Sequence, residues 1–131
     1  MKVAVMGTGG VGGYFGALLA KSGHDVTFVA RGAHLEAILR DGLKIESNLS
    51  GEFVVHVAAT DQPSHIGPVD FILFTPKMYH NAESIPALEP LIGANTVVLP
   101  LQNGVDNGDR LAEAFGKEHV LLGTVYVHSV I

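Results

Sequence analysis

The chain has 131 residues, carries a formal net charge of −5 and contains no cysteine. Its length and its hydrophobic share of 47% suit one folded domain and exclude a disordered chain. The acidic balance disfavours nucleic-acid binding, and the lack of cysteine excludes disulfides, zinc-thiolate sites and cysteine nucleophiles.

The first predicted elements are a buried strand, a glycine-rich turn and a helix. Residues 3–6 form a short apolar run that ends at glycine, as in strands buried on both faces. This run is too short for a secretion signal or a spanning helix, so we expect a cytoplasmic protein without a membrane partner. Apolar residues at helical spacing then predict a helix over 10–22 with Gly23 as its cap.

Strands and helices continue to alternate along the chain. We expect strands at 25–29, 69–75, 96–99 and 120–127, and helices at 33–40, 82–91 and 109–115. Two further runs, 43–47 and 52–57, flank a turn and predict a β-hairpin insertion near residues 43–57. This alternation favours an α/β fold with a doubly wound, mostly parallel, Rossmann-like sheet that forms one domain over residues 1–131.

Each glycine of the turn has a physical task in a dinucleotide site. Gly7 lets the chain turn sharply, Gly9 lets a pyrophosphate approach the backbone, and Gly12 lets the helix pack on the strand. Backbone N–H groups and the positive end of the helix dipole then face the phosphates. The turn does not match a P-loop, because no Gly-Lys-Ser/Thr follows it. The predicted cofactor-binding residues are Gly7, Thr8, Gly9, Gly10, Val11 and Gly12, and the alternative is tight packing without a ligand.

The second predicted strand is followed by Arg31, at the position that selects the dinucleotide. NAD-specific sites usually place an acidic residue here to bind the ribose 2′-hydroxyl. A carboxylate would repel a 2′-phosphate, whereas arginine holds it with charge-assisted, forked hydrogen bonds. Such bonds contribute about 1.5–3 kcal/mol, or roughly ten- to hundredfold in affinity. We therefore predict NADP(H) as the cofactor, against the alternative of an exposed arginine without a ligand.

Two loops follow the strands predicted at 69–75 and 96–99, where open α/β sheets bind ligands. The first loop carries Lys77, which offers an ammonium, and the second carries Asn103, which offers a donor and an acceptor. Alone, Lys77 would be a surface lysine and Asn103 part of a turn. Their shared location favours a role in the site, and we predict no metal there.

Together these segments resemble the N-terminal domain of the ketopantoate reductase (2-dehydropantoate 2-reductase) family. The matching features are the glycine turn, Arg31, Thr75-Pro76-Lys77, Leu101-Gln102-Asn103-Gly104-Val105, and Gly123-Thr124 leading to His128. The resemblance implies an NADPH-dependent oxidoreductase that reduces ketopantoate to pantoate in pantothenate biosynthesis. It implies that Arg31 holds the 2′-phosphate, that Lys77 lies near the cofactor ribose and phosphates, and that Asn103 contacts the nicotinamide and the substrate.

The resemblance also implies a helical C-terminal domain that supplies a catalytic lysine and an acidic residue for the substrate's hydroxyl. Because this chain has neither, we predict no catalytic residue in it, and we expect a cofactor-binding part that is not active alone. Among its histidines, His128 is the least poor candidate for a proton donor. The apolar C-terminal end predicts a homo-oligomer or association with the missing domain. The alternatives are another NADP-dependent 2-oxo or hydroxy acid dehydrogenase, and a non-catalytic dinucleotide-binding module.

Overall fold

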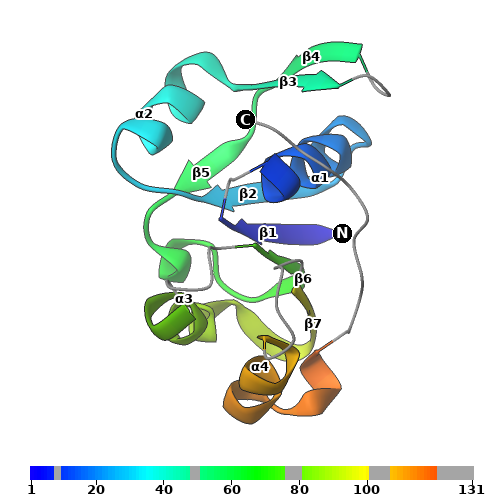
Figure 1. Ribbon diagram of the computed structural model, residues 1–131, viewed down its shortest axis with the longest axis vertical. Helices are drawn as coiled ribbons and strands as arrows, with labels where there is room; N and C mark the ends of the chain where they lie inside the picture. The colour runs from blue at the N-terminus through cyan, green and yellow to red at the C-terminus, as the bar shows by residue number, and fades with distance from the viewer. Residues whose placement is uncertain (8–9, 48–50, 76–80, 101–106, 121–131) are drawn as a thin grey trace.

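A central parallel sheet organises the molecule. The computed structural model describes residues 1–7, 10–47, 51–75, 81–100 and 107–120, and in this part of the chain it shows five sheet strands and a separate hairpin (Figure 1). The sheet strands are β1 (Lys2–Met6), β2 (Asp25–Val29), β5 (Ala58–Thr60), β6 (Val69–Phe74) and β7 (Ile92–Pro100). The hairpin strands are β3 (Leu43–Ser47) and β4 (Gly51–Val55).

The strand order is β5-β2-β1-β6-β7, with every neighbouring pair parallel. The chain therefore builds outward from β1 on one side and then returns to lay β6 and β7 on the other. This is the doubly wound, Rossmann-like α/β fold that the alternating elements predict. The predicted hairpin insertion is also confirmed, since β3 and β4 pair antiparallel in a two-stranded sheet of their own within the described residues.

Helices cover the sheet on both faces. They are α1 (Gly10–Lys21), α2 (Gly32–Asp41), α3 (Asn81–Ala87) and α4 (Asn107–Phe115), with short 3₁₀ turns at Pro63–His65, Glu89–Leu91 and Lys117–His119. Figure 1 shows α1 next to β2, on the side toward the hairpin, while α3 and α4 lie beside β6 and β7. None of the helices in the described ranges combines the length and the apolar character needed to cross a lipid bilayer.

The side chains of β1 alternate between two apolar layers, one on each face of the sheet. Val3 and Val5 pack in the layer beneath α1, together with Phe28 of β2. Ala4 and Met6 belong to the opposite layer. Because successive side chains of a strand point to opposite faces, a strand covered on both sides needs an uninterrupted apolar run. That requirement explains why this strand is readable from the sequence.

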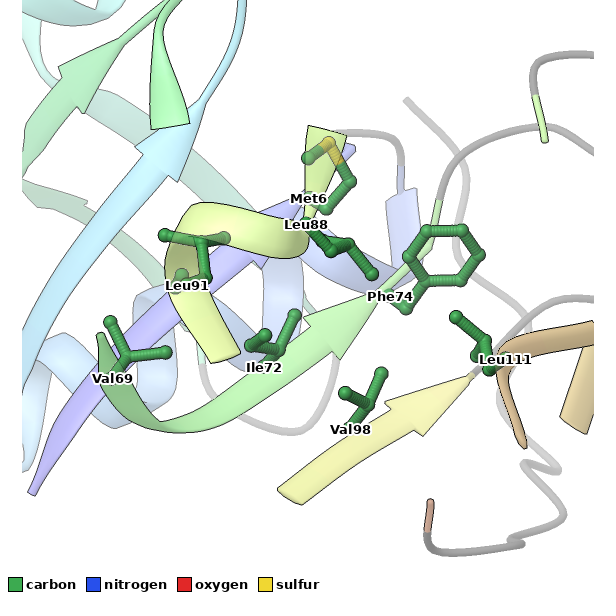
Figure 2. Close-up of a cluster of buried hydrophobic side chains, with 9 residues drawn as sticks. Met6, Val69, Ile72, Phe74, Leu88, Leu91, Val98 and Leu111 are labelled. Atoms are coloured by element: carbon green, nitrogen blue, oxygen red, sulfur yellow. The ribbon is translucent and has the colours of Figure 1, made fainter. Parts of the chain in front are cut away.

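The second layer joins the sheet to the elements that follow β6. Figure 2 shows Ile72 and Phe74 of β6 pointing toward the side chains of Leu88 and Leu111. These four side chains are completely buried. Leu111 and the partly buried Phe115 bring α4 into this layer. The packing fixes the end of β6, from which the next loop departs.

Some boundaries differ from the prediction. The strand predicted over 52–57 corresponds to β4, which ends earlier, at Val55. The separate strand β5 follows it, pairs with β2 and was not predicted. The helix predicted over 82–91 ends at Ala87, because Pro86 and Pro90 have no N–H group with which to continue it.

The third boundary concerns the strand that was predicted over 96–99. It begins earlier, as β7, which runs from Ile92. Of the strand predicted over 120–127, only Val120 lies in the described residues, and it forms a parallel bridge with Val98.

Candidate functional site

Three neighbouring strands end at the same level and bring their following residues together. Met6 of β1 is paired with Val29 of β2 and with Phe74 of β6. The chain therefore leaves the sheet at one edge on all three strands. This is the carboxyl edge of the sheet. The direction in which strands are added reverses between β1 and β6, and open α/β sheets bind ligands at such a point.

Gly7 turns the chain off β1 with a backbone that favours glycine. Its φ is 92°, in the region that L-residues with a side chain rarely adopt. Helix α1 begins at Gly10, so its first turn lies next to the carboxyl edge. Thr8 and Gly9 lie outside the described residues, and Gly10 and Val11 open α1.

Gly12 lies at a contact that leaves no space for a side chain. A Cβ atom at this position would collide with the Thr75 Oγ1 atom and with the carbonyl oxygen of Gly7. The close packing expected of Gly12 is therefore present. Its part in binding a cofactor stays a prediction.

Thr75 connects the end of β6 to the glycine turn. Its backbone N–H donates a hydrogen bond to the Met6 carbonyl oxygen at 2.8 Å. Its side-chain hydroxyl donates to the carbonyl oxygen of Gly7 at 2.6 Å and lies 3.1 Å from that of Met6. From the sequence, Thr75 was assigned no role of its own beyond the family resemblance and the end of a predicted strand. Its position as a polar residue at the end of a buried apolar strand could have indicated one.

Arg31 stands at the start of α2, on the same edge of the sheet. It is the N-cap residue, with an extended backbone (φ −149°, ψ 165°), and its side chain makes no capping hydrogen bond to the helix. The residue before it is anchored, because the Ala30 N–H donates to the Thr60 carbonyl oxygen of β5 at 3.0 Å. The structure thus places an exposed guanidinium-bearing residue beside backbone N–H groups of a helix start.

No acidic residue competes for this position within the first turn of α2. Asp25, the acidic residue of β2, lies at the opposite end of the strand, where it is the register neighbour of Lys2 in β1. Asp61, however, directly follows β5 on this edge, beside the hydrogen bond between Ala30 and Thr60. The described part of this edge therefore combines the Arg31 guanidinium and the Asp61 carboxylate with helix N-termini, and the N-termini suit an anion.

The other predicted residues cannot be placed. Lys77 and Asn103 lie outside the described residues, as do Thr124 and His128. Their roles stay predictions. Among the described residues, no group of three His, Asp or Glu side chains gathers as metal ligands.

An apolar hollow also lies on the α1 face of the sheet. It encloses about 240 Å³ and is lined by Phe15, Leu18, Leu19, Ser22, Leu73 and Leu99. These side chains offer a single hydroxyl and no charge to a ligand. The hollow is therefore unsuited to phosphates, which need charged groups or backbone donors.

Comparison of the sequence with known proteins finds a matching family and several oxidoreductase relatives. A sequence model of the family described as ketopantoate reductase PanE/ApbA matches residues 3–131. An uncharacterised oxidoreductase of Bacillus subtilis, YkpB, is 34% identical over 131 residues, which are 100% of this chain and 43% of the relative. A 2-dehydropantoate 2-reductase of Mesorhizobium japonicum is 37% identical over 106 residues, 80% of this chain and 32% of the relative.

Solved structures agree with the sequence matches. The crystal structure of 2-dehydropantoate 2-reductase from Porphyromonas gingivalis W83 superimposes with a TM-score of 0.89 at 41% identity, covering 97% of this chain and 47% of that one. The chain thus spans less than half the length of each of these three relatives.

A further similar structure contains NADH, whereas the sequence predicts NADP(H) for this chain. A D-mandelate dehydrogenase, solved with NADH and anilino(oxo)acetate, has a TM-score of 0.81 at 28% identity and covers 95% of this chain and 40% of that one. The fold alone therefore does not decide between NADPH and NADH. That choice depends on the residues that this chain itself places at the edge of the sheet.

Proposed function

Because the chain belongs to the ketopantoate reductase PanE/ApbA family, we propose that it is the NADP(H)-binding part of an oxidoreductase that reduces 2-dehydropantoate to pantoate. Arg31 carries the choice of cofactor. It occupies the start of α2, where an NAD-binding protein of this fold usually has an acidic residue for the ribose 2′-hydroxyl. A guanidinium there favours a 2′-phosphate and gives a plain ribose no comparable advantage.

The N-termini of two helices, α1 and α2, bind different phosphates of the dinucleotide. The glycine turn and the first turn of α1 receive the pyrophosphate, because Gly7 gives the backbone its sharp turn and Gly12 lets α1 pack closely against Thr75 and the Gly7 carbonyl. Arg31 and the first turn of α2 receive the 2′-phosphate. Lys77 lies near the cofactor ribose and phosphates, and Asn103 contacts the nicotinamide and the substrate. When bound, the nicotinamide supplies a hydride to the keto carbon of a small 2-oxo acid.

The groups that complete the reaction belong to a further, helical domain of the family. The reduced carbonyl oxygen must receive a proton, and a positioned general acid typically contributes about 10²–10⁴ in rate. The residues that we assign in this chain bind and orient, and none of them is assigned as the acid. We therefore expect this chain to bind NADPH while turning over little or no 2-oxo acid by itself.

A second function is favoured by one of the similar structures. The D-mandelate dehydrogenase, a protein of this fold at 28% identity, was solved with NADH. Under this alternative the chain would serve another 2-hydroxy acid dehydrogenase, and Arg31 would be a surface residue. Dinucleotide preference separates the two functions.

A chimeric enzyme tests the proposal. In the Porphyromonas gingivalis 2-dehydropantoate 2-reductase, the part that this chain covers is replaced by residues 1–131, with the unaltered enzyme as the reference. We expect the chimera to oxidise NADPH in a ketopantoate-dependent reaction, and the chain alone to show only NADPH binding by fluorescence. A folded chimera that used NADH more efficiently than NADPH would contradict the cofactor assignment. Substantial ketopantoate reduction by the chain alone would contradict the assignment of catalytic groups elsewhere.

A further inference from the structure

The junction of β6 with the glycine turn contains a hydrogen bond that packing alone does not require. Thr75 already continues the β1–β6 pairing through its backbone N–H, which donates to Met6. Its hydroxyl makes an additional contact, 2.6 Å from the Gly7 oxygen and 3.1 Å from the Met6 oxygen. A hydroxyl has a single proton to donate. The shorter distance assigns that proton to Gly7.

We infer that Thr75 is a positioning residue of the dinucleotide site, which holds the Gly7 carbonyl against β6 and thereby fixes the orientation of the turn. A carbonyl oxygen carries partial negative charge and would repel a pyrophosphate if it faced the ligand. Anchoring the oxygen of Gly7 on Thr75 therefore keeps this partial negative charge directed at β6.

The contacts of Gly12 show how little freedom this junction has. The two atoms that a Cβ on Gly12 would strike are the hydroxyl oxygen of Thr75 and the carbonyl oxygen of Gly7. The two atoms of this hydrogen bond are therefore also the atoms against which the first turn of α1 packs. Loss of the bond would free the Gly7 peptide to rotate and would loosen the seat of α1. This inference rests on the proposed dinucleotide binding, and it adds a residue that does not itself touch the cofactor.

Thr96 provides a matched control in the same sheet. Its hydroxyl is buried, donates to the Val69 carbonyl oxygen and accepts from the Gly93 N–H at 2.7 Å. Val69 begins β6, whereas Thr75 follows its end. The two threonines therefore make comparable bonds at opposite ends of one strand, and only Thr75 adjoins the glycine turn.

The experiment compares Thr75→Ser with Thr75→Ala, and Thr96→Ser with Thr96→Ala, because each pair differs by a single hydroxyl. Dissociation constants for NADPH and for NADH are measured by cofactor fluorescence, and urea unfolding is followed by circular dichroism. We expect Thr75→Ala to weaken both dinucleotides by the same factor, about three- to tenfold, as for one lost hydrogen bond. Thr75→Ser should keep the affinity of the original chain. Both Thr96 variants should keep it too, although Thr96→Ala should unfold at lower urea.

The outcomes separate the inference from the proposed function. If the original chain binds NADPH and Thr75→Ala binds it equally well, the positioning role is overturned and the proposed function stands. If Thr75→Ala weakens NADPH alone, Thr75 acts at the 2′-phosphate and the positioning role is also overturned. If the original chain binds neither dinucleotide, both the function and the inference fall. Should Thr75→Ala not fold, Thr75→Val removes the same hydroxyl and carries the same expectation.

Discussion

Replacing Gly12 by alanine tests whether the turn and α1 are as closely packed as the structure shows. The added Cβ would meet the Gly7 carbonyl oxygen, which belongs to a backbone held at a φ of 92°. It would also meet the hydroxyl oxygen of Thr75, which is already hydrogen-bonded to that carbonyl. Neither atom is the free end of a flexible side chain, so the helix or the turn must move.

The magnitude follows from two opposing effects. Inserting a methyl group into a close-packed contact typically costs about 1–3 kcal/mol. Alanine in place of glycine inside a helix returns up to about 1 kcal/mol, and less is expected here because Gly12 belongs to the first turn of α1. We therefore expect Gly12→Ala to lower the free energy of unfolding by about 1–2 kcal/mol, and to weaken NADPH binding because the turn is displaced.

Gly23→Ala is the control for Gly12→Ala. Gly23 has a φ of +97° and no atom within 4 Å of its hypothetical Cβ. Its substitution strains only the local backbone, at about 1–2 kcal/mol, and leaves the turn untouched. Urea unfolding and NADPH titration should show a loss of stability in both variants and a loss of affinity in Gly12→Ala alone. A Gly12→Ala variant as stable as the original chain, with unchanged affinity, would refute the packing that we describe.

Two further predictions concern the supports of the site. Leu111 is completely buried in the layer that joins α4 to β6, so Leu111→Ala should lower the free energy of unfolding by about 2–5 kcal/mol in urea titrations; a loss no larger than that of an exposed leucine such as Leu39 (59% exposed) would contradict the packing. The Lys21 ammonium lies 4.5 Å from the centroid of the Phe53 ring in the hairpin, a contact that contributes about 0.5–1 kcal/mol at exposed sites. Lys21→Met should therefore speed hydrogen exchange of the β3 and β4 amides, and unchanged exchange would show that the hairpin does not depend on this contact.

The parts of the fold that the sequence predicts are those specified by neighbouring residues. The apolar run of β1 is readable because burial on both faces demands apolar residues. Gly7 is readable because a positive φ favours glycine, and Gly12 because its contact leaves no space for a side chain. Strand β6 is readable for the same reason as β1. The hairpin is readable because two runs flank a short polar turn.

The parts that escaped prediction depend on residues far apart in the chain. Strand β5 has only three residues, Ala58–Thr60, none of them buried, and it exists because it pairs with β2. The hydrogen bond of Thr75 joins residues separated by 68 positions. Neither can be derived from local periodicity.

The choice of cofactor is tested most directly by titrating the chain and its Arg31→Ala variant with NADPH and with NADH. Arg40→Ala is the control, since it removes the same charge from α2 at an exposed position paired with Asp41. The account predicts that the original chain prefers NADPH, that Arg31→Ala weakens NADPH binding about ten- to hundredfold without weakening NADH, and that Arg40→Ala changes neither. Equal affinity of the original chain for both dinucleotides, or an equal loss of both in Arg31→Ala, would contradict it.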